Sequence, residues 1–295
     1  FKQDLYAFVA EFDLSTGRVR LPARSVNARR EQAASPRWSA DGRSFFYGAV
    51  EPAAGLEALV TRPEPSGAER RVPLGQALNY VQWLVPSPDG RSVAVGGFDK
   101  EMNYGMFQID PAAGTIRRII ELPKENIIWP EPSWSPDGKA IYYKHRATEA
   151  ADAFVVLRRD LETGAERQVY QGTVNPQGLT LSPDGTRFAF LHGRPHVLVT
   201  MGGAGEMKEL DRAEESVELQ APAWSADGQR ILYCKKGRDG SDLWWVPASG
   251  GTPERLASLG ESIFTLAMDP AGKRIAWTAK STTSEVWALE NLLPK

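Results

Sequence analysis

The sequence predicts an all-β fold, a six-bladed β-propeller built from four-stranded antiparallel blades. Two observations carry this prediction: one turn motif recurs six times, and each copy is followed by a run of apolar, β-prone residues. The glycines shared by the copies are Gly42, Gly90, Gly138, Gly185, Gly228 and Gly272, with successive separations of 48, 48, 47, 43 and 44 residues. Periods of about 40–50 residues are typical of propeller blades, and no stretch shows the capped 3.6-residue periodicity of a helix.

The turn motif is clearest in the third copy, which reads WSPDGKAIYY from Trp134. Proline fixes the φ angle suited to an early turn position, Asp bonds to nearby backbone, and Gly accepts a positive φ. Such a turn joins two antiparallel strands as a hairpin. The recurring acids are therefore interpreted as turn residues rather than catalytic groups: Asp41, Asp89, Asp137, Asp184 and Asp227.

The strand that follows each turn is apolar on both of its alternating faces, as in residues 188–190 and 231–233. A strand of this kind is covered on both faces, so neighbouring sheets are expected to stack on either side. Two weaker strands follow in each repeat, and we expect third strands at residues 104–110, 154–160 and 242–246. Four strands in each of six repeats define the propeller.

The two ends of the chain are predicted to close the ring of blades. Residues 4–13 and 17–21 look like the third and fourth strands of a repeat that lacks its first half. The last repeat, within residues 262–290, has strands one to three, with the third at 286–289. A strand from residues 1–21 would complete this blade and remove the open sheet edges. Because the N-terminus offers two strands where one is missing, a fifth strand or a partial seventh blade stays open.

Composition excludes several classes of protein. The 295 residues include 35 Lys or Arg and 37 Asp or Glu, and this net charge of −2 provides no basic face for nucleic acid. A single Cys excludes a disulfide framework, and no apolar run approaches the ~18 residues of a membrane span. Since the repeats consume the length, we expect one domain over residues 1–295. The chain starts at Phe1 rather than Met, which indicates a processed or trimmed chain.

The six WSPDG-like turns and the aromatic strands beside them resemble the TolB-type, WD-related propeller repeat over residues 1–290. The resemblance implies six blades, but no particular chemistry, because the matching residues are structural. It implies a periplasmic or envelope-associated scaffold for protein complexes. A similarity to modules that follow kinase or DNA-binding domains in bacterial regulators implies instead a sensor part, which would be cytoplasmic. Pro86, Leu181 and Ala271 depart from the pattern, and we expect their turns to lose a hydrogen bond or a packed ring.

Three neighbouring repeats place a polar residue seven positions after the shared glycine: His145, His192 and Lys235. In the predicted fold these residues mark the upper ends of second strands, and Arg146 lies beside the first of them. This pattern predicts a polar half-rim that recognises an anionic or polar partner. The alternative is that each strand simply emerges into solvent at this point.

Aromatic side chains gather in three loops that are predicted on one face of the propeller. These loops carry Tyr80, Tyr104 and Trp129. Exposed aromatic residues are typical of the hot spots of protein interfaces, so this face is a second candidate binding surface. The alternative is that Tyr80 and Trp129 plug the propeller or pack between its blades.

The sequence shows no signature of a metal, a cofactor or a catalytic set. A metal site needs three or more convergent ligands, and the chain has three His, which fall in different repeats or in a hairpin turn. No Gly-x-Ser-x-Gly elbow, P-loop or dinucleotide-binding fingerprint is present. We therefore expect no metal and no cofactor.

The predicted function is non-enzymatic: a recognition or scaffold propeller, monomeric as an isolated domain. It would bind a protein, a peptide or a small polar ligand at one face or in the central channel. The alternative is a propeller lyase or hydrolase with a polar site at the channel mouth. For that alternative, the candidate residues are His145, His192, Arg146 and Lys235.

Overall fold

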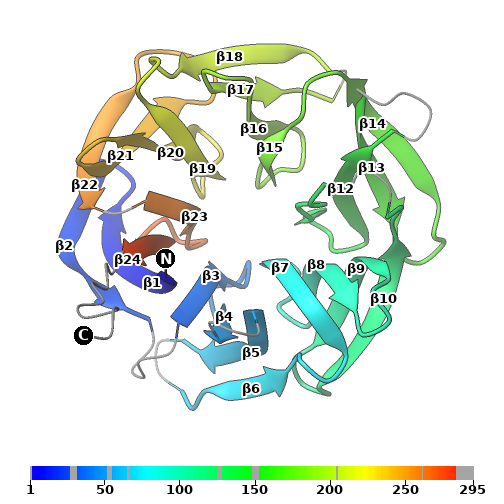
Figure 1. Cartoon of the computed structure of the whole chain (residues 1–295). Helices are drawn as coiled ribbons and strands as arrows, with labels where there is room; N and C mark the ends of the chain where they lie inside the picture. The colour runs from blue at the N-terminus through cyan, green and yellow to red at the C-terminus, as the bar shows by residue number, and fades with distance from the viewer. Residues whose placement is uncertain are drawn as a thin grey trace, which may run out of the picture.

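All regular secondary structure in the described part of the chain is β-strand. This computed structural model describes residues 2–26, 32–51, 55–64, 67–124, 128–147, 153–203, 205–260 and 262–283. Those residues form 24 strands in six four-stranded sheets, and they contain no helix. The sheets stand around a common axis like the blades of a propeller (Figure 1). The predicted all-β, six-bladed fold is therefore confirmed.

The first strand of each blade lies nearest the axis, and the second strand pairs with it (Figure 1). The first strands are β3 (Gln32–Trp38), β7 (Leu78–Pro86), β11 (Ser133–Trp134), β15 (Gln177–Leu181), β19 (Glu218–Trp224) and β23 (Ser262–Met268). The second strands are β4 (Ser44–Glu51), β8 (Val93–Asp99), β12 (Ala140–Arg146), β16 (Phe188–His192), β20 (Arg230–Gly237) and β24 (Arg274–Thr283).

The third and fourth strands complete each blade toward its outer rim. The third strands are β5 (Gly55–Pro63), β9 (Tyr104–Asp110), β13 (Phe154–Asp160), β17 (Val197–Met201), β21 (Gly240–Pro247) and β1 (Lys2–Asp13). The fourth strands are β6 (Arg70–Pro73), β10 (Thr115–Glu121), β14 (Glu166–Gly172), β18 (Met207–Arg212), β22 (Glu254–Gly260) and β2 (Arg18–Ser25). We number the blades in this order, so blade 1 is β3 to β6 and blade 6 combines β23 and β24 with β1 and β2.

Blade 6 closes the ring, as the sequence predicts, but with two N-terminal strands instead of one. β1 pairs antiparallel with β24, from Lys2 opposite Thr283 to Glu11 opposite Arg274, and β2 pairs with the other edge of β1. The expectation that residues 286–289 form the third strand of this blade falls outside the described residues, and β1 occupies that place beside β24. Because β1 and β2 supply the third and fourth strands of blade 6, the described residues form neither a fifth strand in this blade nor a partial seventh blade.

The repeated turns share one hydrogen-bond pattern, illustrated by blade 3. The Ser135 hydroxyl donates to Asp137 Oδ1 at 2.6 Å, and the same oxygen accepts the Lys139 backbone N–H at 3.0 Å. These bonds lower the pKa of the Asp137 carboxyl, and Gly138 supplies a φ of 69°. The same Ser–Asp bond recurs in the first five turns. The repeated aspartates are thus held in turns, as the spacing predicts.

The sixth turn corrects one expectation from the sequence. Ala271 stands where the other turns have Asp, and a lost hydrogen bond was expected there. Asp269, at the position of the serine, compensates because its Oδ1 accepts the backbone N–H groups of Lys273 at 2.7 Å and Arg274 at 3.0 Å. One carboxylate therefore replaces the Ser–Asp pair.

The core lies between the blades, and β20 shows why its strand is apolar on both faces. Tyr233 and Cys234 are each 0% exposed; Tyr233 packs in the cluster toward blade 4, and Cys234 in the cluster toward blade 6. The Trp224 indole N–H also links blades 5 and 4, donating to the Thr180 carbonyl oxygen at 3.2 Å. No helix in the described residues is long and apolar enough to cross a membrane.

Candidate functional site

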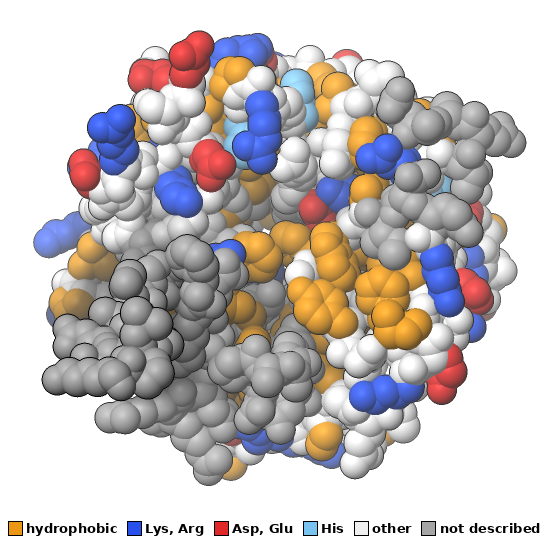
Figure 2. All heavy atoms as spheres, in the orientation of Figure 1, with side chains coloured by type: hydrophobic (Ala, Val, Ile, Leu, Met, Phe, Trp, Pro, Cys, Tyr) orange, Lys and Arg blue, Asp and Glu red, His pale blue; other side chains and the backbone are white. Residues whose placement is uncertain are grey.

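Three residues predicted for binding, Tyr80, Tyr104 and Trp129, pack together on blades 2 and 3. The Trp129 ring centroid lies 5.4 Å from that of Tyr80 and 6.3 Å from that of Tyr104. Phe98 joins the group, 5.0 Å from Tyr104 and 6.4 Å from Trp129. We call these four residues, together with the adjacent Met102, the aromatic patch. Figure 2 shows hydrophobic side chains gathered over blades 2 and 3.

Within the aromatic patch, Tyr104 is buried, whereas Tyr80 and Met102 are exposed to solvent. Tyr104 is 2% exposed, and its hydroxyl donates to the carbonyl oxygen of Ile128, which fixes the backbone next to Trp129. Burial raises the pKa of Tyr104, so this hydroxyl stays protonated as a donor. Tyr80 and Met102 are instead 41% and 49% exposed. The patch therefore offers apolar side chains to solvent on a buried aromatic base.

A buried ion pair anchors the chain directly after Trp129. Glu131 Oε1 lies 2.8 Å from Lys144 Nζ, with side-chain exposures of 9% and 3%. Glu131 Oε2 also accepts the backbone N–H of Leu179 in blade 4 at 2.7 Å, and Lys144 donates to the Pro176 carbonyl oxygen. The connection that carries Trp129 is thereby tied to blades 3 and 4. The repeat did not predict this anchor, because the residue at the position of Glu131 differs in every other blade: Ser35, Trp83, Gly178, Ala221 and Thr265.

Aromatic contacts continue from blade 2 toward the axis. Trp83 on β7 stacks on Phe264 of β23, with ring centroids 5.7 Å apart. Side chains of blades 2 and 6 therefore contact each other although blade 1 lies between these two blades in the ring (Figure 1). Phe264 is 41% exposed. The φ angle of Trp83 is 62°, at a register shift of β7, and this bulge directs the side chain out of the regular pleat.

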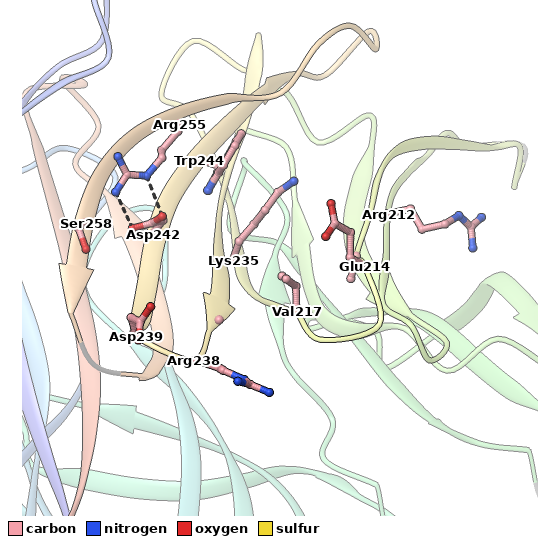
Figure 3. A pocket seen from close by; sticks show the side chains of 13 residues that line it. Arg212, Glu214, Val217, Lys235, Arg238, Asp239, Asp242, Trp244, Arg255 and Ser258 are labelled. Carbon is pink, nitrogen blue, oxygen red and sulfur yellow. Dashed lines mark hydrogen bonds and ion pairs between the residues drawn. The ribbon is translucent and has the colours of Figure 1, made fainter.

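A second candidate region is a cleft of about 540 Å³ between blades 4 and 5 (Figure 3). One wall consists of side chains from β20, β21 and β22; the other is the connection between β18 and β19. We call this space the charged cleft. Its lining residues are Arg212, Ala213, Glu214, Val217, Lys235, Gly237, Arg238, Asp239, Gly240, Asp242, Trp244, Arg255 and Ser258.

The charges of this cleft are largely paired. Lys235 Nζ lies 2.8 Å from Asp211 Oδ2 and 4.3 Å from the centroid of the Trp244 ring. Arg255 donates to both carboxylate oxygens of Asp242, from Nε at 2.7 Å and from Nη2 at 3.0 Å. The hydrogen bond from Arg255 lowers the pKa of the Asp242 carboxyl, which stays ionised. Figure 3 shows this pair on one wall and Glu214 across from Lys235.

Of the four residues predicted to form a polar half-rim, only Lys235 lines the charged cleft. His145 Nδ1 lies 2.7 Å from the Arg146 carbonyl oxygen, and the Arg146 guanidinium lies 5.1 Å from the Phe154 ring centroid. His192 is in blade 4, where burial, then Arg212, lowers the pKa of its imidazole. These residues belong to second strands of three different blades, β12, β16 and β20, and the contacts given for His145, Arg146 and Lys235 are to different partners.

The described residues include no group of three or more His, Cys, Asp or Glu side chains that could hold a metal ion. His196, which the sequence places at a hairpin tip, is 9% exposed, and its Nδ1 lies 3.0 Å from the Leu219 carbonyl oxygen. It belongs to the contact between blades 4 and 5 and is not a surface histidine.

Sequence reasoning did not predict Asp242, Arg255 and Glu214 as binding residues. Asp242 is opposite Lys235 in the β20–β21 register, so a signal existed once that hairpin was aligned. Arg255 had no such signal, since β21 and β22 shift register twice between Ser241 and Trp244. Glu214 lies in a connection whose position depends on two blades.

A closed ring of six four-stranded blades with repeated Ser-x-Asp-Gly turns defines the class of protein, a TolB-like propeller. The family model of the TolB β-propeller domain matches residues 21–259, and the chain belongs to that family. A search of curated proteins found no match.

Several solved structures share the fold. A structure assigned to TolB from Agrobacterium tumefaciens has a TM-score of 0.71 and 18% identity, covering 95% of this chain and 100% of that one. TolB from Acinetobacter baumannii has a TM-score of 0.64 and 18% identity, covering 93% of this chain and 63% of that one. An oligogalacturonate lyase in complex with manganese has a TM-score of 0.61 and 16% identity, covering 92% and 77%. At these identities the likeness concerns the fold alone.

Proposed function

We propose that this chain is a non-enzymatic recognition propeller that binds a protein or peptide through the aromatic patch. The observation that carries the proposal is the exposure of Tyr80 and Met102, at 41% and 49%, above the packed rings of Phe98, Tyr104 and Trp129. Aromatic residues and Met are enriched at protein interfaces, where rigid rings give contact area at low entropic cost. We also propose that residues 1–295 form one domain and act as a monomer.

Preorganisation supports this assignment. The Gln82 side-chain amide donates to the Tyr80 hydroxyl at 2.6 Å, and the Asn79 amide lies 2.9 Å from Met102 Sδ. Tyr104 packs against Trp129, and the Glu131–Lys144 ion pair anchors the chain two residues further on. Little conformational entropy is therefore lost when a partner binds. An interface on such a base loses less entropy than one on free loops.

The alternative, a propeller lyase or hydrolase, has no comparable observation in its favour. Its candidates His145, His192 and Lys235 lie in three blades, and Lys235 is engaged by Asp211. A general base needs to lie within hydrogen-bond reach of a reacting group beside its partners, and this arrangement brings no such set together. We therefore do not propose an enzymatic function.

Site-specific cross-linking tests the proposed function. A photoreactive amino acid replaces Tyr80 in one version of the protein and Met207 in another, since Met207 on β18 is a large apolar side chain of the same exposure, 40%. We expect a discrete cross-linked partner from Tyr80 and none from Met207. Y80A should then weaken that partner's binding by about 30-fold, as for a hot-spot residue, and M207A should leave it unchanged. Equal cross-linking at both positions would reject the patch as the interface.

A further inference from the structure

The charged cleft between blades 4 and 5 has the dimensions of a small-molecule site and is separate from the aromatic patch. Its volume of about 540 Å³ lies within the roughly 300–1,000 Å³ typical of ligand pockets. It is formed by elements of blades 4 and 5, whereas the patch belongs to blades 2 and 3. Figure 2 shows the contrast, with side chains of both charges interspersed over blades 4 and 5.

The ion pairs argue against an ionic ligand. Lys235 is neutralised by Asp211 at 2.8 Å, and Arg255 by Asp242 through two hydrogen bonds. An anion at Lys235 or Arg255 would compete with one of these carboxylates, and a cation at Asp211 or Asp242 would compete with Lys235 or Arg255. Moreover, the lining carries Lys, Arg, Asp and Glu together, so any ion placed there meets a like charge as well as an opposite one.

The same pairs suit a neutral ligand that both donates and accepts hydrogen bonds. After its two bonds to Asp242, the Arg255 guanidinium retains further N–H donors, and the carboxylate retains acceptor sites. The pair therefore offers a donor and an acceptor side by side on one wall. Ser258 adds a hydroxyl on this wall, and Glu214 adds acceptors opposite. Neighbouring hydroxyls of a sugar are likewise both donors and acceptors.

An apolar surface accompanies these polar groups. Trp244 is half-buried: it packs partly against the core of blades 4 and 5, the Lys235 ammonium lies 4.3 Å from its ring centroid, and the remainder of its indole lines the cleft. Its Nε1 is buried and has no hydrogen-bond acceptor among the described residues. Val217 and Ala213 lie on the opposite wall. Such surfaces contact the C–H groups of a sugar ring, whereas inorganic phosphate has no C–H groups to place there.

We propose that the charged cleft binds a neutral saccharide. The Asp242–Arg255 pair hydrogen-bonds two neighbouring hydroxyls, Glu214 accepts a third from the opposite wall, and Trp244 contacts the ring carbons. Lys235 keeps its bond to Asp211 and closes the inner end of the wall. This inference does not depend on the function proposed for the aromatic patch.

A glycan array followed by calorimetry tests the proposal. The array carries neutral oligosaccharides of glucose, galactose, mannose and N-acetylglucosamine, with uronic-acid oligosaccharides for comparison. We expect a neutral glycan to bind, with affinity falling at least about tenfold in D242N and in W244A, because each loses a direct contact. The matched control is R159Q, which breaks a similar cross-strand pair, Arg159–Glu166 at 2.8 Å in blade 3.

The possible results separate cleanly. Binding of a neutral glycan that D242N weakens and R159Q leaves intact supports the proposal, even if W244A fails to fold. Binding to uronic-acid glycans alone, or to no glycan, overturns it, as does neutral binding that D242N leaves unchanged. Y80A should not alter glycan binding, so a failure of the patch proposal is distinguishable from a failure of this one.

Discussion

The aromatic patch and the charged cleft are built from the same two kinds of connection and carry opposite chemistry. Each uses a turn between second and third strands, β8–β9 in the patch and β20–β21 in the cleft. Each also uses a connection from a fourth strand to the next blade's first strand, β10–β11 and β18–β19. One combination presents Phe98 and Trp129, and the other presents Glu214 and Arg238. The repeat therefore specifies backbone, while blade-specific side chains specify what can bind.

The two regions also differ in what holds them together. Ring packing and a buried ion pair support the patch, whereas the ion pairs at the cleft are partly exposed, with side-chain exposures of 23% and 12% for Lys235–Asp211. Exposed pairs are screened by salt and contribute little to stability, while a buried charge that loses its partner is strongly destabilising. Substitutions in the two regions should therefore have unequal effects.

The largest effect is expected from K144M, which leaves Glu131 buried without its cation. We expect the free energy of unfolding to fall by about 3–5 kcal/mol in chemical denaturation, since breaking a buried pair leaves an uncompensated charge. The fluorescence of Trp129 should also shift, because Glu131 anchors the chain next to it. K235M, which removes the more exposed lysine, is the comparison and should cost clearly less. Equal decreases in the free energy of unfolding for K144M and K235M would contradict the difference that we infer between the two regions.

Y104F should have an intermediate effect. It removes the donor to the Ile128 carbonyl oxygen in a site where Tyr104 is 2% exposed. Leaving that acceptor unsatisfied should lower the free energy of unfolding by about 1–2 kcal/mol, measured by urea titration. Y80F is the matched control, as the Tyr80 hydroxyl belongs to a side chain that is 41% exposed, and it should be nearly neutral. If Y104F leaves the free energy of unfolding unchanged, the hydrogen bond from Tyr104 to Ile128 does not stabilise the patch.

The sequence predicted those parts of the molecule that repeat. Spacing of the glycines located every blade, and alternation of apolar residues located strands such as β9 and β13 at their observed bounds. It also brought Tyr80, Tyr104 and Trp129 to one face. It could not place His145, His192 and Lys235 relative to one another, because the spread of the blades is a property of the closed ring. Nor could it pair Arg255 with Asp242, which depends on strand bulges.

A smaller effect is expected from R255Q in the cleft. The side chains of Arg255 and Asp242 are 53% and 34% exposed, so their pair is largely solvated. The thermal unfolding midpoint should fall less than in Y104F, and the difference from wild type should shrink further at 1 M salt, where screening is strong. R159Q, with exposures of 29% and 34% for its pair, should behave alike. A loss that salt does not reduce would mean that Arg255 contributes packing rather than charge.

The pH dependence of that small difference separates the regions most sharply. Arg255 lowers the pKa of Asp242 in the folded protein, so the pair stabilises the fold above the ordinary Asp pKa of about 3.9. This contribution is lost as pH falls through the lowered folded pKa, because the carboxyl is then protonated in both states. The stability difference between wild type and R255Q should therefore be present at pH 7 and decrease progressively as the pH falls below about 4. The difference between wild type and Y104F involves no group that titrates in this range and should stay constant from pH 7 to pH 3. Denaturant midpoints for wild type, R255Q and Y104F between pH 7 and pH 3 measure both trends. If the stability differences of R255Q and Y104F change with pH in the same way, the cleft is not stabilised by an ionised Asp242 as we infer.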